Sequence, residues 1–202
     1  MDGKLLATRK AVRVSHVRPV LVLLLVAGLI LSVLILKDAL KPSFAADYPD
    51  YATVDALRAV SDAIVVGQVG ESIGKFEDRG GDPEFDEFGD PIPGIPMEVF
   101  AFNVSRASTS EIAVGDTIPV LWVDLDAVNS DDLTRLHPGD ELVLFLEHLT
   151  PASAPDLAKF GDEVWVPVSG DNGVMDVGSD GSASPRSSVV EKAVIDLRDI
   201  FG

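Results

Sequence analysis

The sequence predicts a mainly β domain: a small OB-like barrel or Greek-key sheet with a short N-terminal helix and a C-terminal amphipathic helix, preceded by one transmembrane helix. Three observations lead to this fold class. Short apolar or alternating runs bounded by turn residues recur after residue 60. One of these runs, Leu142–Leu146, is apolar at every position. An uncharged stretch, residues 19–36, precedes them all. A β-sandwich is the alternative fold.

The apolar stretch PVLVLLLVAGLILSVLIL, residues 19–36, has the length and hydropathy of a membrane-spanning helix. None of its 18 residues is charged, and as a helix it would extend about 27 Å, close to the roughly 30 Å of a bilayer's hydrocarbon core. Five basic residues precede it, whereas only Lys37 and Lys41 follow closely. By the positive-inside rule, residues 1–18 form a cytoplasmic basic tail and the rest of the chain lies outside.

The sequence allows two fates for this segment: removal by a signal peptidase or retention as a membrane anchor. Ser43-Phe44-Ala45 places small residues at the −3 and −1 positions that a signal peptidase requires, so cleavage near Ala45 would give a secreted domain. However, the apolar run is longer than a usual signal core, and charged residues separate it from that site. We therefore expect an uncleaved signal anchor in the plasma membrane, a tether over residues 37–50 and an extracytoplasmic β domain over residues 51–202.

Charge is distributed unevenly along the chain. Residues 1–46 contain seven basic and two acidic residues, whereas the remaining 156 residues contain nine basic and 31 acidic residues, a net charge of −22. A domain with this charge repels nucleic-acid phosphates, so we predict no nucleic-acid binding. The chain has no cysteine, which excludes disulfides, thiolate catalysis and cysteine-ligated zinc. The outer domain must therefore be stabilised by its apolar core.

The outer domain is predicted to begin with a short helix and a strand. Val54, Leu57 and Val60 are spaced three apart and follow a threonine that can cap a helix N-terminus. The β-branched run Ala63–Val69 is typical of a strand. Residues 77–96 are dense in acids, prolines and glycines. Because such residues interrupt both helices and strands, we predict a long acidic loop inserted between two strands.

The remaining strands are predicted in the same way. We expect them at Met97–Ser105, Thr117–Asp124, Leu142–Leu146, Val164–Val166 and Val174–Val177. The last two should form a hairpin around the turn Asp171-Asn172-Gly173, followed by a loop over residues 179–187. Because Leu142–Leu146 is apolar on both faces, we expect a central strand that is covered on both sides.

The end of the chain is predicted to supply one of these covers. Residues 188–191 have the pattern of a capping box, which marks a helix N-terminus. Val190, Val194, Leu197 and Phe201 would lie on one face of the helix that follows, opposite charged residues. We expect this amphipathic helix to pack on the outer face of the sheet.

The order of these runs resembles a known class of protein. DAIVVGQV, VFAFNVSRA, VGDTIPVLW and LHPGDELVLFLE, followed by a tryptophan-containing strand and NGV, resemble a widespread exported or membrane-anchored bacterial β domain whose members commonly have no assigned activity. The same order, over residues 54–177, is similar to the netrin-like module of metalloprotease inhibitors, which implies an OB-type barrel. Those inhibitors act through an N-terminal cysteine, which this chain lacks, so no inhibitory mechanism and no functional residue is carried over.

Histidines are the only residues that suggest catalysis. His137 lies in the turn before the apolar run and His148 lies at its end, so the two should be too far apart to share a metal ion. The sequence contains no H-E-x-x-H, G-x-S-x-G or P-loop motif. We predict no catalytic residue and no bound cofactor. A secreted hydrolase that uses His137 or His148 is the alternative.

The acidic loop raises the question of calcium. Asp82, Glu84, Asp86 and Asp90 are close together in sequence, and carboxylate oxygens are the ligands that Ca²⁺ prefers. Their spacing does not match an EF-hand. We expect a solvated acidic loop, and the alternative is a calcium-binding module formed by residues 77–90.

Two phenylalanines, Phe85 and Phe88, are unusual in such a loop. They would either pack on the barrel, which we expect, or bind a protein partner outside the cytoplasm. The sequence as a whole predicts a non-enzymatic binding or interaction module of the cell envelope. The module would be attached to the membrane through residues 19–36 and exposed on the extracytoplasmic side.

Overall fold

The structure is a computed structural model that describes residue 32 and residues 41–44, 48–79, 85–130, 133–150, 155–188, 190 and 194–201. No helix within these ranges is long and apolar enough to cross a membrane. The predicted cytoplasmic tail and the predicted membrane helix lie outside them, apart from residue 32.

The described residues form a mainly β fold with eight strands and two short α-helices, which confirms the mainly β part of the prediction. The strands are β1 (Ala63–Asp78), β2 (Ile95–Ala107), β3 (Thr117–Val123), β4 (Glu141–Leu149), β5 (Val164–Pro167), β6 (Val174–Val177), β7 (Ser182–Pro185) and β8 (Ile195–Asp196). The helices are α2 (Val54–Val60), α3 (Leu197–Phe201) and the 3-10 helices η1 (Pro155–Phe160) and η2 (Gly170–Gly173).

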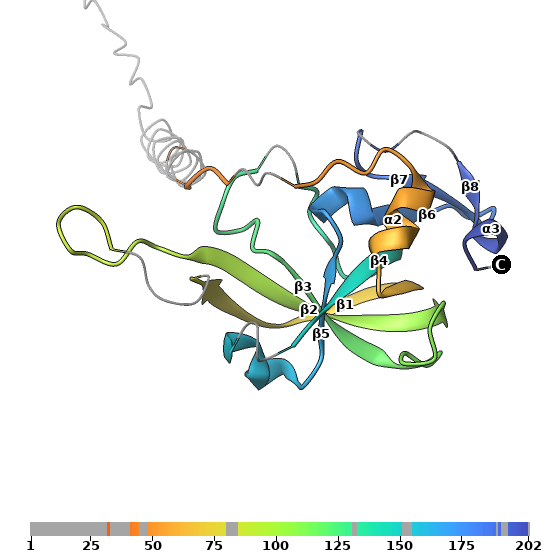
Figure 1. The fold of residues 1–202 in the computed structure, drawn as a ribbon, viewed down its shortest axis with the longest axis horizontal. Helices are drawn as coiled ribbons and strands as arrows, with labels where there is room; N and C mark the ends of the chain where they lie inside the picture. The colour runs from red at the N-terminus through yellow and green to blue at the C-terminus, as the bar shows by residue number, and fades with distance from the viewer. Residues whose placement is uncertain are drawn as a thin grey trace, which may run out of the picture. The chain divides into compact units, whose positions relative to one another are not determined.

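Five of these strands are connected in a closed circuit of backbone pairing. β1 pairs antiparallel with β2 along one edge and with β4 along the other. β2 pairs with β3, and β4 pairs with β5. β3 and β5 run parallel and meet at Val120 and Trp165, which closes the circuit. β6, β7 and β8 extend the sheet outward from β4 (Figure 1).

Strand β4 is buried on both faces. Leu142, Leu144 and Leu146 point into the circuit and join an interior cluster to which β1, β2, β3 and β5 all contribute. Val143 and Phe145 point the other way, into an outer cluster. All five side chains are 0% exposed, and each contributes about 1.5–3 kcal/mol to stability by leaving water. The predicted doubly covered strand is confirmed.

Different elements cover the outside of the circuit on its two sides. Leu57 of α2 packs in the outer cluster with Leu197 and Ile200 of α3. On another face, Leu157 of η1 packs with Leu121 of β3 in a third apolar cluster. Figure 1 shows α2 and η1 on opposite sides of the strands. The strands of the circuit are therefore shielded outside as well as inside.

Helix α2 begins as predicted. Thr53 has extended backbone angles, and its Oγ1 accepts a hydrogen bond from the backbone N–H of Ala56 at 3.2 Å. This bond satisfies one of the free amides at the helix N-terminus. Leu57 is fully buried, but Val60, which was expected on the same face, is exposed.

Strands β5 and β6 do not form the predicted hairpin. β5 pairs with the end of β4 and β6 with its beginning, both antiparallel, so they are successive segments along one edge of β4. The expected turn is part of η2, and its residues Asp171 and Asn172 are buried. Trp165 and Val174 both pack in the interior cluster. The chain therefore continues beside β4 after η2 because the apolar residues on either side of it are buried in the same core.

The end of the chain also differs from prediction. Among the described residues near the C-terminus, the helix is α3, which starts at Leu197. The two residues before it form β8, which pairs with β7. β7 lies in the segment that was predicted to be a loop. Ala183 of β7 is fully buried, whereas Val194, which was expected on the apolar helix face, is 71% exposed. The β-branched Ile195 pairs with Ala183, so backbone pairing at this edge prevails over the helical pattern.

The acidic loop is shorter than predicted at both ends. Glu77 pairs with Pro96 and Asp78 pairs with Ile95, so four residues assigned to the loop are in the strands. The predicted insertion between two strands is correct, but the ladder continues into it. The density of prolines and glycines in residues 77–96 therefore did not prevent pairing near the strand ends.

Strand β1 leaves β4 half-way along its length. It pairs with β4 only over Ala63–Gln68 and then continues with β2 alone. β1 shifts register against β2 at Gly67, where a Cβ atom would lie 2.1 Å from the carbonyl oxygen of Asn103. Only glycine allows so close an approach. Beyond this point β1 pairs with β2 alone, and we call residues 71–78 and 95–100 the β1–β2 arm. Met97–Phe100 of this arm also pair with β3, and the loop at the end of the arm projects in Figure 1.

Part of the predicted tether lies on the domain, and the compact unit begins at Pro42. The backbone N–H of Phe44 donates to the carbonyl of Asn129 at 2.7 Å, and the N–H of Asn129 donates to the carbonyl of Pro42 at 2.9 Å. The rings of Phe44 and Tyr48 are partly buried against the interior cluster. Burial of the Phe44 and Tyr48 rings favours packing of this segment on the domain over an unattached tether.

Substitutions on the two faces of β4 test the double burial. In the full-length protein, Leu144→Ala should lower the free energy of unfolding by about 2–5 kcal/mol and Phe145→Ala by about 3–5 kcal/mol, because each leaves a cavity in a different cluster. Urea unfolding followed by circular dichroism measures both. Val114→Ala, at a side chain that is 70% exposed, should change stability by less than about 0.5 kcal/mol. A β4 with one solvated face would make one of the first two substitutions as mild as the control.

Candidate functional site

The first candidate site is the tip of the β1–β2 arm, residues 85–91. The two ends of this segment form an isolated antiparallel bridge. The backbone N–H of Asp86 donates to the carbonyl of Asp90 at 2.8 Å. The Asp86 carboxylate accepts hydrogen bonds from the N–H groups of Phe88 and Asp90, each at 2.9 Å. These bonds hold the tip as a defined turn.

The tip presents apolar side chains to solvent. Phe85 is 59% exposed and Phe88 is 82% exposed, so the expectation that they pack on the domain is wrong. Ile92 and Ile95 further along the arm are also exposed. We call these four residues the tip patch. The hydrogen bonds to the Asp86 carboxylate define the local turn, and on this turn the Phe88 side chain faces solvent.

The predicted calcium ligands are only partly described. Asp82 and Glu84 lie outside the described residues. Asp86 shapes the turn through its carboxylate, and Asp90 is exposed. Within the part of the chain that the structure describes, no group of three or more His, Asp or Glu side chains is placed to hold a metal ion. The calcium-binding alternative therefore stays a prediction.

The second candidate site is a cleft of about 220 Å³ beside the point where β1 leaves β4. Buried or partly buried side chains of β2, β3 and the β3–β4 connection form its apolar floor: Phe100, Trp122, Val123, Leu125 and Leu136. Its rim is polar and consists of Glu71, Ser72, Glu98, Asp126, Arg135 and His137, with Pro138 beside them. An apolar floor with a few converging polar groups is the usual composition of a small-ligand site.

A lysine connects three carboxylates beside this cleft. The ammonium nitrogen of Lys75 lies 2.8 Å from Asp124 Oδ1, 3.5 Å from Glu98 Oε1 and 3.8 Å from Asp126 Oδ2. Partial burial would lower the pKa of Lys75, but the hydrogen bond to Asp124 and the charge of Glu98 raise it overall. Arg135 pairs with Asp126 on the opposite side. The cations at this cleft are therefore already engaged by its own acids.

The turn from His137 to Asp140, predicted from the sequence, borders the cleft and is bound to β1. The backbone N–H of Gly139 donates to the carbonyl of Val69 at 2.7 Å, and the N–H of Val69 donates to the carbonyl of Asp140 at 2.9 Å. The side-chain amide of Gln68 donates to the carbonyl of Gly139 at 3.2 Å. These three bonds fix one wall of the cleft against the strand.

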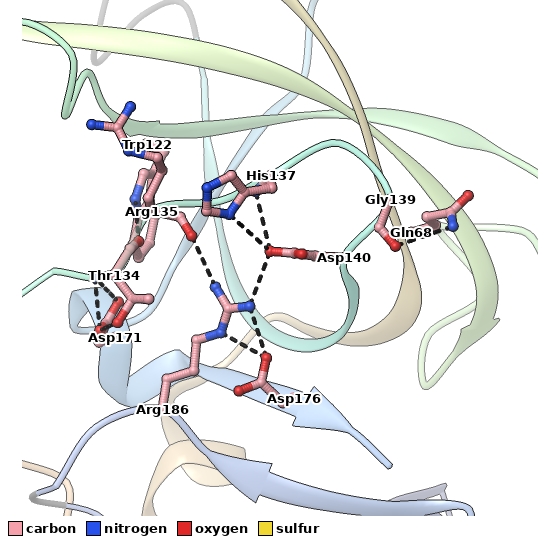
Figure 2. Close-up of polar contacts among 10 residues, drawn as sticks. All are labelled: Gln68, Trp122, Thr134, Arg135, His137, Gly139, Asp140, Asp171, Asp176 and Arg186. Atoms are coloured by element: carbon pink, nitrogen blue, oxygen red, sulfur yellow. Dashed lines mark hydrogen bonds and ion pairs between the residues drawn. The ribbon is translucent and has the colours of Figure 1, made fainter. Parts of the chain in front are cut away.

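Arg186 holds the same turn from below, as Figure 2 shows. Its guanidinium donates to Asp140 Oδ2 at 3.0 Å, to Asp176 Oδ1 at 2.8 Å and to the carbonyl of Arg135 at 3.3 Å. The side chain of Arg186 is only 10% exposed. Burial lowers the pKa of Arg186, but its two carboxylate partners raise it overall. Arg186 thus joins β6 and the end of β7 to the β3–β4 connection.

A further polar contact supports the floor of the cleft. The indole N–H of Trp122 donates to the carbonyl of Thr134 at 3.2 Å. The backbone N–H of Thr134 donates to the buried carboxylate of Asp171 at 2.9 Å, and its hydroxyl bonds to the same carboxylate. Asp171, which was predicted to lie in a hairpin turn, therefore positions Trp122 through Thr134. Burial and the charge of Asp171 also raise the pKa of the nearby Tyr48.

The two outer histidines lie at opposite ends of β4, as expected. His137 is exposed, and its Nδ1 lies 3.8 Å from Asp140 Oδ2. The ring of His148 packs at a tilt against Trp165 with centroids 5.0 Å apart, and its buried Nε2 has no hydrogen-bond partner among the described residues. Nor does any described serine or threonine hydroxyl bond to either imidazole. The hydrolase alternative remains a prediction.

Sequence reasoning missed most of the cleft. Lys75 and Glu98 face each other across the β1–β2 ladder, and this pair could have been found only if the strands had been extended past Val69. Arg186 lay in a segment predicted as a loop. The only signal in the sequence that Arg186 could be structural is that it is one of few basic residues in a strongly acidic domain.

Comparisons with known proteins do not add a template for these sites. No family model, no curated protein and no solved structure matches this chain. The candidate sites are therefore argued from their own geometry.

The Arg186 contact predicts a pH-dependent stability. Partial burial would raise the pKa of Asp140, but the His137 N–H and the Arg186 guanidinium lower it below its ordinary value. A carboxylate with a lowered pKa in the folded state stabilises at pH values above the unfolded pKa, near 4, and loses this effect as pH falls through the folded pKa. Asp140→Asn should therefore lower the free energy of unfolding by about 1–2 kcal/mol at pH 7.

The difference between Asp140→Asn and the parent should shrink as the pH is lowered from about 5 to about 3, as measured by urea unfolding at each pH. Asp162→Asn is the control, because Asp162 is exposed and makes no hydrogen bond or ion pair with the described residues. A stability difference for Asp140→Asn that is the same at both pH values would contradict the proposed role of the carboxylate.

Proposed function

We propose that this chain is a membrane-anchored, extracytoplasmic and non-enzymatic binding module that holds a protein partner through the tip patch. Residues 19–36 would be the anchor and residues 42–202 the binding domain. The observation that carries the proposal is the 82% exposure of Phe88 on a turn that is defined by its own hydrogen bonds. Exposed aromatic side chains on a defined turn are typical of binding anchors.

The chemistry of the tip patch indicates what kind of partner would fit. Phe85 and Phe88 alternate with the exposed acids Asp86, Glu87 and Asp90. A complementary surface would have an apolar pocket with a rim of lysine or arginine side chains. An anionic lipid surface is disfavoured because it would repel the same acids. The partner is therefore expected to be a protein with a basic, apolar-centred surface.

The order of pairing supports a finer assignment of the fold. β1 pairs with both β2 and β4, and β3 lies beside β5, so the five strands follow the circuit β1-β2-β3-β5-β4. We propose that this circuit is a barrel of the OB type, which matches the resemblance to the netrin-like module. In that arrangement the β1–β2 connection, which here carries the tip patch, is one of the loops that bind ligands.

Photo-crosslinking in native membranes tests the proposal. The chain is first expected in the membrane fraction at the intact mass of residues 1–202, which tests the anchor against cleavage near Ala45. A benzoylphenylalanine placed at position 88 should then form one discrete adduct with a protein. The same probe at Val114, which is 70% exposed on another loop, should not form that adduct.

Charge reversal makes the result specific. Glu87→Lys combined with Asp90→Lys should reduce the adduct at least about fivefold, because the variant repels a basic rim. Glu111→Lys, on a separate loop, should leave it unchanged. Absence of an adduct at position 88, or the same adduct at Val114, would contradict binding through the tip patch.

A further inference from the structure

The cleft beside the β1–β2 arm has an imbalance of charge that the tip patch does not explain. Four carboxylates lie at or beside it: Glu71, Glu98, Asp124 and Asp126. The cationic side chains Lys75 and Arg135 are bonded to three of them. Arg135 also donates to the carbonyl of Leu125 at 2.7 Å, so its guanidinium is occupied.

Glu71 is the carboxylate that remains. It lies on the rim of the cleft and makes no hydrogen bond or ion pair with any residue that the structure describes. The cleft thus combines an apolar floor, an excess of negative charge and one unpaired carboxylate. A rim of this kind would favour a cationic ligand and repel an anionic one.

A metal ion fits these groups poorly. The ammonium of Lys75 already lies between Glu98, Asp124 and Asp126, where a divalent cation would have to bind. The described residues contain no group of His, Asp or Glu side chains placed to hold a metal. The apolar floor formed by Phe100 and Trp122 would also leave most of a metal ion's coordination sites without an oxygen ligand.

We propose that the cleft binds a protonated amine on a short unbranched apolar stem. The ammonium would donate to Glu71, with the Glu98 carboxylate nearby, and the stem would lie on the floor against Trp122. The cleft has a volume of about 220 Å³, and on this measure one water needs only about 10–15 Å³, so an ammonium and a stem of five carbons fit. A free alkylamine and a lysine side chain of a polypeptide both supply this chemistry.

The test uses the indole N–H resonances of the full-length protein in detergent. The chain has two tryptophans. Both pack in the interior cluster, but only Trp122 also lines the cleft. Pentylamine, titrated to about 10 mM, should shift the Trp122 resonance saturably and leave that of Trp165 in place. Pentanol and pentanoate have the same stem without the positive charge and should cause little shift.

A matched pair of variants locates the ammonium. Glu71→Gln should weaken pentylamine binding about tenfold, since it removes a charge-assisted hydrogen bond. Glu111→Gln, which removes an exposed acid elsewhere, should bind as the parent does. Equal binding by Glu71→Gln, a comparable effect of pentanol, or the same Trp122 shift with Ca²⁺ or Mg²⁺ alone would overturn the proposal.

A second probe, lysine with its backbone amine and carboxyl blocked as amides, distinguishes the two sources. Binding of pentylamine alone would assign the cleft to free amines, and binding of both would assign it to a lysine side chain of a polypeptide. Binding of neither, or of blocked lysine alone, would overturn the proposal. This result does not depend on the tip patch, so the cleft and the proposed function succeed or fail separately.

Discussion

The burial of β4 on both faces is the constraint on which the rest of the structure depends. One face closes the interior of the five-strand circuit, and the other requires a cover from elements far apart in sequence, α2 and α3. A strand that pairs on both edges and packs on both faces has no freedom to shift its register. The β1–β2 arm and the cleft lie outside this centre, because β1 contributes to them only after it stops pairing with β4 at Gln68.

Strand β4 could be predicted from the sequence, whereas the segments around η2 and β8 could not, because local patterns do not contain contacts between distant segments. In Leu142–Leu146, local composition and tertiary burial agree, so the pattern was sufficient. At Asp171-Asn172-Gly173, turn-forming residues are buried beside β4 because apolar residues on either side of them belong to the same core. At Ile195, a helical pattern gives way to pairing with β7. Both errors arise from contacts between distant segments, which local patterns do not contain.

The candidate sites follow the same division. Phe85 and Phe88 were identified because phenylalanine is conspicuous in an acidic loop, although their exposure was not predicted. The cleft was not identified, because its members come from three strands and a connection that no spacing in the sequence links. Glu71 differs from the other acids at the cleft, Glu98, Asp124 and Asp126, in having no partner among the described residues. This difference depends on the fold and not on the local sequence.

Hydrogen exchange of the full-length protein measures the central claim most directly. If β4 is the fixed centre, the amides of Leu142–Leu146 and of the paired segment Ala63–Gln68 should exchange most slowly, through global unfolding only. The β1–β2 arm and β8 should exchange faster, through local opening. Slowest exchange in the arm or in β7 and β8, with earlier exchange in Leu142–Leu146, would contradict the account.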